Sequence, residues 1–296
     1  MKKTIRIIGV PIDLGQNQRG VDMGPSAIRY AGLSTRLKSL SYQLYDEGNL
    51  YVPVRDSLAD KHGSDFLGAV QQVCQAAYNA AADAVAAGEI PLFLGGDHSL
   101  SIGTIGGVSS HDPVGVVWVD AHGDANSPAT SPSGNIHGMP VATLLGDGYP
   151  ELVDIGRPGA KLSGKDVVMI GIRDLDGEER DWLKKSGVKV YTMRDLDERG
   201  MGSVTREALE FLSDHNRIHV SIDMDALDPN TAPGVGTPAP GGLSCREAQL
   251  LMEIIADTKK LVSADIVEIN PILDHENRTA KMAVELVTSL FGKSIF

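Results

Sequence analysis

The sequence is short of cysteine, of long apolar runs and of basic residues. Two of its 296 residues are cysteines, Cys74 and Cys245, and they form no CxxC pair. This low count argues against a disulfide-stapled scaffold and favours the reducing cytoplasm. No apolar stretch approaches the ~20 residues of a membrane-spanning helix, and the apolar run after Lys3 is too short for a signal peptide. We therefore expect a cytoplasmic protein with no membrane partner.

Basic residues are outnumbered by acidic ones. The chain has 27 Lys and Arg against 39 Asp and Glu, for a formal net charge of −12 at pH 7. No cluster of basic residues is present to bind phosphates, so nucleic acid is not an expected partner, and a cationic ligand or a metal is more compatible. Hydrophobic residues make up 42% of the chain, and no Pro/Gly/Ser-rich linker or charge block divides it. Residues 1–296 are therefore predicted to form a single domain.

Short β-branched runs alternate with helical patterns along the whole chain. Runs such as Val114–Asp120 are apolar throughout, which indicates strands buried on both faces of a parallel sheet. The fold predicted is a three-layer α/β/α sandwich with a central, mainly parallel eight-stranded sheet. The strands expected are Thr4–Val10, Tyr42–Asp46, Ile90–Leu94, Val114–Asp120, Val167–Gly171, Lys189–Thr192, Ile218–Asp223 and Leu261–Glu268. Among the helices expected are Pro25–Ala31, Asp65–Ala87, Ser244–Ala256 with Glu247 completing a capping box, and Asn277–Phe291.

Three of these strands end in side chains that can bind metals. Gly95-Gly-Asp-His98 follows the third strand, Asp120-Ala-His-Gly-Asp124 the fourth, and Asp223-Met-Asp225 ends the seventh. Each cluster alone would fit a helix cap or a loop turn. Ligands in a parallel α/β sheet bind at the carboxyl ends of its strands, so all three clusters are expected to meet at one edge.

Together, the three clusters indicate two metal ions. Four aspartates and two histidines brought together without a cation would repel one another at low dielectric, whereas two divalent ions would neutralise four negative charges. The ligands are mostly hard carboxylate oxygens with no thiolate, which suits manganese better than structural zinc. Two such ions ~3.5–4 Å apart can activate a bridging hydroxide. Metal-assisted hydrolysis is the chemistry predicted.

The same motifs resemble a known family, the ureohydrolases, and within it the arginases. The ureohydrolase signatures are Gly95–His98, Asp120–Asp124 and Asp223–Pro229, in the family's order and across nearly the whole chain. Segments similar to arginases rather than agmatinases are Ser131–Pro140, Arg173–Asp176 and Val267–Pro271, and Arg19–Pro25 is similar to bacterial arginases. The sequence departs from many members at Ala226, where they have glycine.

The resemblance implies an arginase-like fold and a place in arginine metabolism and the urea cycle. It implies two Mn²⁺ per subunit, and hydrolysis of L-arginine to L-ornithine and urea by attack of a metal-bridging hydroxide on the guanidinium carbon. It also implies a homotrimer or homohexamer. Agmatinase, or another guanidino-compound amidinohydrolase, stays open as the alternative within the family.

The resemblance also assigns roles to individual residues. The implied metal ligands are His98, Asp120, His122, Asp124, Asp223 and Asp225, with Asp124 and Asp223 among the shared ones. The implied catalytic residues are His137, which shuttles protons to the leaving amine, Glu268, which receives the guanidinium, and the ligand Asp124. The implied substrate-binding residues are Asn126, Ser133 and Asn135 at the α-carboxylate, Asp176 and Glu179 at the α-ammonium, and Thr237. Glu178 remains an alternative to Glu179, because the spacing of this acid varies in the family.

Two functions outside the family also remain open. A binuclear metallophosphoesterase uses similar ligands, but its asparagine and histidine are adjacent, whereas here Ile136 separates Asn135 from His137. A non-catalytic metal-binding protein is disfavoured, because His137 and Glu268 accompany the complete ligand set.

Overall fold

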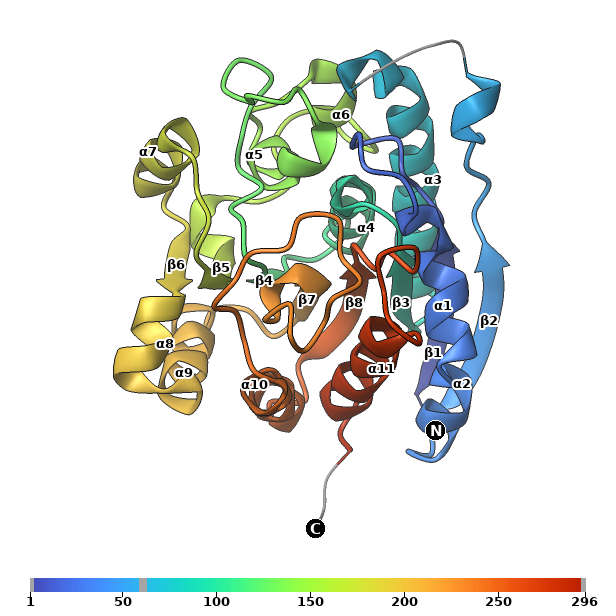
Figure 1. Cartoon of the computed structure of the whole chain (residues 1–296), viewed down its shortest axis with the longest axis vertical. Helices are drawn as coiled ribbons and strands as arrows, with labels where there is room; N and C mark the ends of the chain where they lie inside the picture. Colours follow the sequence, from blue (N-terminus) through green and yellow to red (C-terminus); the bar gives the residue numbers. More distant parts are fainter. Residues whose placement is uncertain (1–2, 59–62, 294–296) are drawn as a thin grey trace.

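The central sheet is built entirely from parallel neighbours. The structure is a computed structural model that describes residues 3–58 and 63–293. Within this part of the chain one sheet has the strand order β2-β1-β3-β8-β7-β4-β5-β6, and every pair of adjacent strands is parallel (Figure 1). The strands are β1 (Thr4–Val10), β2 (Gln43–Asn49), β3 (Ile90–Gly95), β4 (Gly115–Val119), β5 (Val167–Ile172), β6 (Lys189–Thr192), β7 (Ile218–Asp223) and β8 (Leu261–Val267).

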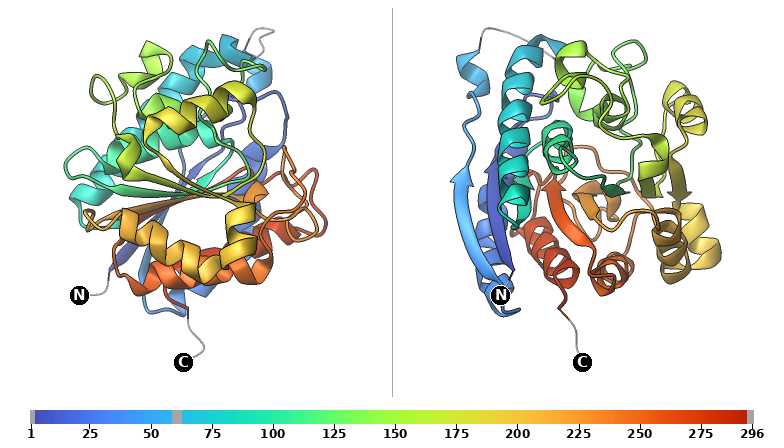
Figure 2. Two further views of the ribbon diagram at one scale, coloured as in Figure 1. Left: turned by 90° about the vertical axis from the view of Figure 1, so that its left-hand side faces the viewer. Right: turned by 180° about the vertical axis from the view of Figure 1, so that it is seen from behind.

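Helices cover both faces of this sheet, as Figure 2 shows edge-on. The helices are α1 (Gly24–Tyr30), α2 (Leu33–Lys38), α3 (Leu67–Ala86), α4 (Ser101–Val108), α5 (Pro140–Leu144), α6 (Pro150–Val153), α7 (Gly177–Ser186), α8 (Met193–Arg199), α9 (Met201–Phe211), α10 (Cys245–Asp257) and α11 (Arg278–Leu290). Helices α3 and α4 pack on one face, whereas α1, α2, α9, α10 and α11 pack on the other. The predicted three-layer architecture is confirmed. No described helix is long and apolar enough to cross a membrane.

Strand β4 shows why the strands read as continuous apolar runs. Val117 and Val119 contribute to the core beneath α9–α11, while Val116 and Trp118 contribute to the core beneath α3 and α4. Successive side chains of a strand point to opposite faces, so a strand covered on both faces needs apolar residues at every position.

Most predicted elements are found with shifted ends. The predicted helix 65–87 begins instead as a 3₁₀ turn, Gly63–Phe66, and becomes α-helical only at Leu67. The capping box of Ser244 and Glu247 is present at the start of α10. Strand β8 was expected to include Glu268 but ends at Val267, because Glu268 has a left-handed backbone with φ of +62°.

The strand order brings the ligand-bearing strands together. Strands β3, β8, β7 and β4 are consecutive in the middle of the sheet and all point the same way. Their carboxyl ends therefore meet, although they come from segments as far apart as residues 95 and 267.

Candidate metal centre and active site

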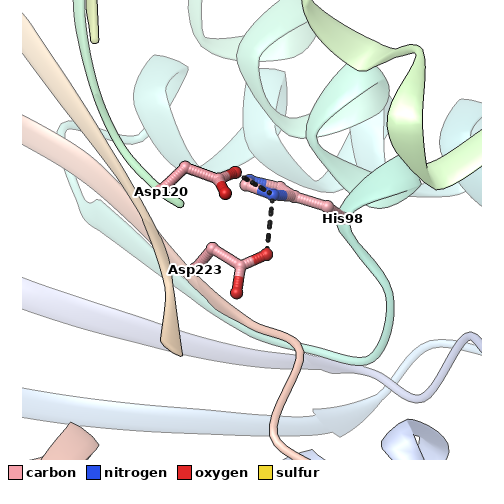
Figure 3. Close-up of side chains that lie close together, drawn as sticks. All are labelled: His98, Asp120 and Asp223. Atoms are coloured by element: carbon pink, nitrogen blue, oxygen red, sulfur yellow. Dashed lines mark ion pairs between the residues drawn. The ribbon is translucent and has the colours of Figure 1, made fainter. Parts of the chain in front are cut away.

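Three side chains at the carboxyl ends of β3, β4 and β7 form a closed cluster, the inner group: His98, Asp120 and Asp223 (Figure 3). His98 Nδ1 lies 3.3 Å from Asp120 Oδ2, 3.1 Å from Asp223 Oδ2 and also 3.1 Å from Asp124 Oδ2. This nitrogen is buried and has no hydrogen-bond partner among the described residues. A lone nitrogen facing three carboxylate oxygens is the arrangement expected of ligands around a cation.

A second cluster, the outer group, consists of Asp120, His122 and Asp225. His122 Nδ1 lies 3.0 Å from Asp225 Oδ2 and 3.5 Å from Asp120 Oδ1. Thr237 Oγ1 donates to the same Asp225 oxygen at 3.0 Å. Asp120 belongs to both groups, so the two clusters are adjacent and could hold a pair of ions.

The backbone at the strand ends sets the directions of these side chains. Asp223 caps the 3₁₀ turn Met224–Ala226 by accepting from the Asp225 amide at 2.8 Å. Asp120 Oδ1 accepts from the His122 amide at 2.7 Å. Asp124 has a left-handed φ of +47°, which a residue other than glycine rarely adopts. Strain of this kind is held where the surrounding structure requires one side-chain direction.

Burial and neighbouring charges shift the pKa values of the buried carboxylates. Burial, followed by the charge of Asp120, raises the pKa of Asp124 to about 6. Burial and the charge of Asp225 raise the pKa of Asp223 well above its usual range. Burial opposes ionisation of Asp120, but the adjacent His122 and His98 imidazoles outweigh it and hold the Asp120 pKa below its usual range. Cations in this cluster would favour the ionised form of every carboxylate.

His137 and Glu268 form an ion pair beside the inner group. His137 Nδ1 lies 2.9 Å from Glu268 Oε1, which also accepts from the His98 amide at 3.0 Å. The other oxygen, Oε2, accepts from Gln16 Nε2 at 2.7 Å. Burial opposes protonation of His137, but the charge and hydrogen bond of Glu268 outweigh it and raise the His137 pKa to about 9. The His137 ring is thereby poised to carry a proton at neutral pH.

Acidic and amide groups lie at the other end of the site, around the start of α7. Asp176 is the N-cap of α7, and its Oδ1 accepts from the Glu179 amide at 2.9 Å, while its Oδ2 accepts from Asn126 Nδ2 at 2.7 Å. Glu179 Oε1 accepts from the Ala125 amide at 2.9 Å. Burial raises the Glu179 pKa to about 8, so a cationic group nearby would strongly favour its ionised form.

A cavity of about 280 Å³ connects the two ends of the site. Ten predicted site residues line it: His122, Asp124, Asn126, Ser133, His137, Asp176, Glu179, Asp223, Asp225 and Thr237. His98, Asp120, Asn135 and Glu268 do not line it. Glu268 contacts His137 behind the wall, and Asn135 Oδ1 is buried without a partner among the described residues. Glu178 faces a different surface groove, whereas Glu179 faces this cavity.

The sequence did not reveal three residues that organise the site. Asp97 accepts from the Gly15 amide at 2.8 Å, and Gln16 then reaches Glu268. The Arg173 guanidinium donates to several backbone carbonyls of residues 225–240, including Asp225 O at 2.7 Å, and so fixes the segment that carries Thr237. Asp97 lies in the Gly95–His98 motif and Arg173 begins the Arg173–Asp176 motif, so their positions in the sequence were a usable signal. Gln16 offered none, because its partner is 252 residues away.

Comparisons with known proteins agree with this geometry. Residues 3–292 match the family described as "Arginase family". The arginase of Bacillus subtilis strain 168 is 49% identical over 299 residues, and that of Brevibacillus brevis is 48% identical over 297, with 100% of both chains covered in each case. The solved arginase of Bacillus caldovelox is 48% identical with a TM-score of 0.96, again over 100% of both chains. These matches confirm the resemblance and the expected fold, and the chain belongs to the arginase family.

Proposed function

We propose that this protein hydrolyses the guanidinium group of L-arginine to give L-ornithine and urea. It is a hydrolase of the arginase family, and its full-length relatives at about 48% identity are named arginases. The observation that carries the proposal is the cavity, which has metal-ligating side chains at one end and a pair of acids at the other. Its volume of about 280 Å³ is close to the lower end of the ~300–1,000 Å³ range of small-molecule pockets.

The proposed cofactor is a pair of Mn²⁺ ions. His98, Asp120, Asp124 and Asp223 would hold one ion, and Asp120, His122, Asp223 and Asp225 would hold the other. The donor set fits this group, since it has hard carboxylate oxygens, one imidazole for each ion and an unpartnered buried nitrogen at His98. When bound, the ions supply a hydroxide nucleophile at neutral pH. The resemblance implied that Asp124 and Asp223 are among the shared ligands, whereas the geometry favours Asp120 in place of Asp124 beside Asp223.

The proposed general acid is His137, which faces the cavity. The Glu268 carboxylate is fully enclosed and holds Nδ1 of the His137 ring, so Nε2 is the atom free to donate a proton to the leaving amine of ornithine. Glu268 itself was predicted to receive the guanidinium, and that role stays a prediction. Its contacts favour a further one, which is to keep the His137 ring protonated and oriented.

The acids at the far end of the cavity are proposed to bind the amino-acid head of the substrate. Asp176 and Glu179 line the cavity and would receive an α-ammonium, while Asn126 and Ser133 also line it and would donate to an α-carboxylate. Asn126 would exchange its present bond to Asp176 for the substrate. Asn135, Thr237 and the other predicted contacts belong to the same proposal.

The substrate proposal is tested by urea release from a panel of guanidino compounds with added Mn²⁺. Agmatine shares the guanidinium and methylene chain of arginine but lacks the α-carboxylate. A site that hydrogen-bonds this carboxylate should reject agmatine by on the order of 10⁴-fold in kcat/KM. Comparable values for the two substrates would favour the agmatinase alternative. A similar fold is found in the solved formimidoylglutamase of Bacillus subtilis, which is 27% identical with a TM-score of 0.80 over 97% of this chain and 86% of that chain. That protein is named for a different substrate, so the specificity of this one must be measured directly.

The cellular setting is proposed on separate grounds. Both cysteines are free in the described structure, which supports a reducing cytoplasm. A homotrimer or homohexamer and a role in the urea cycle rest on the family resemblance. A continuous sheet across the described residues supports one domain over residues 1–296. Analytical ultracentrifugation would test the oligomeric state.

A further inference from the structure

A second cluster of buried polar side chains lies behind the inner group, between α4 and strands β7 and β8. Its members are Ser101, Thr104, His219, Ser221, Ser263 and Asp265, and each is 0% exposed. None of them lines the cavity. Polar groups in a dry core are costly unless they are hydrogen-bonded. Six polar side chains in one buried place therefore call for a physical reason.

Three links connect this cluster to the proposed metal ligand His98. Asp265 Oδ2 accepts from Ser101 Oγ at 2.9 Å, and Ser101 Oγ lies 3.4 Å from Ser221 Oγ. Ser221 Oγ in turn lies 2.8 Å from His98 Nε2. The His98 ring also stacks on Trp118, with centroids 4.0 Å apart and planes at 10°. The ring is therefore held both at its edge and on its face.

The direction of each hydrogen bond in this chain follows from Asp265. Ser101 Oγ donates its single hydroxyl proton to Asp265 Oδ2. Ser101 must then accept from Ser221, whose own proton is thereby used. Ser221 can then only accept from His98, which requires a proton on Nε2. The opposite nitrogen, Nδ1, is left with its lone pair facing the three carboxylates of the metal centre.

The remaining members keep Asp265 in place. Thr104 Oγ1 donates to the same oxygen, Oδ2, at 2.8 Å. His219 Nε2 lies 3.2 Å from Oδ2 without hydrogen-bond alignment, and His219 Nδ1 pairs with Ser263 Oγ at 2.7 Å. Thr104 and Ser101 thus make equivalent contacts with Asp265, but only Ser101 lies on the path to His98.

We propose that Asp265, acting through Ser101 and Ser221, is a positioning residue that fixes the tautomer and orientation of His98 for metal binding. This inference rests on the proposed metal centre and deepens it. Ligating histidines commonly donate their second ring N–H to a carboxylate or another acceptor, and loss of that partner typically costs ~10–100-fold in metal affinity. Here the carboxylate acts at a distance, through two serine hydroxyls.

The test compares Ser101→Ala with Thr104→Val in the full-length chain. Each variant removes one hydroxyl that donates to Asp265 Oδ2, so both should lower the thermal midpoint of the chelated protein to a similar extent. The Mn²⁺ dissociation constants, measured by titration, should differ. At the tighter of the two sites, we expect the dissociation constant to rise about 10-fold in Ser101→Ala. In Thr104→Val it should change by less than about 2-fold. Ser221→Ala breaks the chain one link nearer to His98 and should weaken binding at least as much.

Equal effects of Ser101→Ala and Thr104→Val on the dissociation constant would overturn the proposal, as would unchanged binding in both Ser101→Ala and Ser221→Ala. Titration of the unaltered chain separates this result from failure of the metal centre itself. If the unaltered chain binds two Mn²⁺ and the matched pair behaves alike, only the relay is wrong. If it binds none, the metal centre and the relay are both wrong.

Discussion

The inner and outer groups use the same kinds of ligand in different surroundings. The His98 side chain is 0% exposed, stacked on Trp118 and bonded to Ser221, whereas the His122 side chain is 25% exposed and faces the cavity. The surroundings of the His98 ring are thus supplied by protein, whereas His122 is open to the cavity. This difference supports the proposal that the inner end maintains the metal centre and that the outer end selects and processes the substrate.

Removal of Asp120 should erase the distinction between the two ends, because this residue belongs to both groups. We expect Asp120→Ala to bind neither ion stoichiometrically and to lose urea release to the background of the assay. Loss of a buried ligand leaves the remaining charges uncompensated and removes the metal's contribution to stability. Metal analysis after gel filtration, with activity measured on the same sample, checks this. A variant that still holds two ions would contradict it.

Removal of His137 should lower turnover and leave the bound metal in place. General acid-base groups typically contribute ~10²–10⁴-fold to turnover, and His137 contacts Glu268 rather than the metal-ligating carboxylates. His137→Asn should therefore lower kcat by that factor while its Mn²⁺ content equals that of the unaltered chain. A parallel loss of metal and activity would instead make His137 a ligand.

Part of this arrangement could be predicted from sequence, and the reason is local. An unbroken apolar strand leads directly into Asp120, His122 and Asp124. Both the strand and the candidate metal ligands at its end could therefore be predicted from local sequence. The features that could not be predicted, such as the direction of the Glu268 side chain and the part played by Gln16, depend on long-range contacts or on unusual backbone. Glu268 was taken as the end of a strand, but its φ of +62° turns it towards His137. Gln16 meets Glu268 only because β1 and β8 both flank β3.

The neighbouring acids Glu178 and Glu179 test recognition at the outer rim. Glu179 is 5% exposed and faces the cavity, whereas Glu178 faces another groove. A charge-assisted hydrogen bond is worth ~1.5–3 kcal/mol, so Glu179→Gln should raise KM for arginine by roughly 10–100-fold. Glu178→Gln is the matched control and should change KM by less than about 2-fold. The reverse order would move the ammonium contact to Glu178.

The two histidine ligands should differ in what they contribute to stability. His98→Ala leaves a buried cavity against Trp118 and a Ser221 hydroxyl that has lost one of its two partners, whereas His122→Ala exposes its site to water. In chelated protein we expect His98→Ala to lower the free energy of unfolding by about 2 kcal/mol more than His122→Ala does. Urea denaturation of both variants measures this, and equal losses would show that the inner end is no more dependent on packing than the outer one.

The smallest expected effect is a shift in the pH profile. Glu268 raises the pKa of His137 to about 9, so the proposed general acid is protonated below that pH and loses its proton above it. Glu268→Gln removes the charge, and the alkaline limb of kcat for this less active variant should move to lower pH. An alkaline limb that stays at the same pH would assign it to a group other than His137.

The central claim is that one site with two ions hydrolyses arginine, and a single titration tests it most directly. Chelated protein is titrated with Mn²⁺ while bound metal and urea release from L-arginine are followed in the same samples. We predict that activity rises to its maximum as two Mn²⁺ bind per chain and that agmatine in place of arginine gives little urea. Full activity with at most one bound ion, or no urea release from arginine at two bound ions per chain, would contradict the claim.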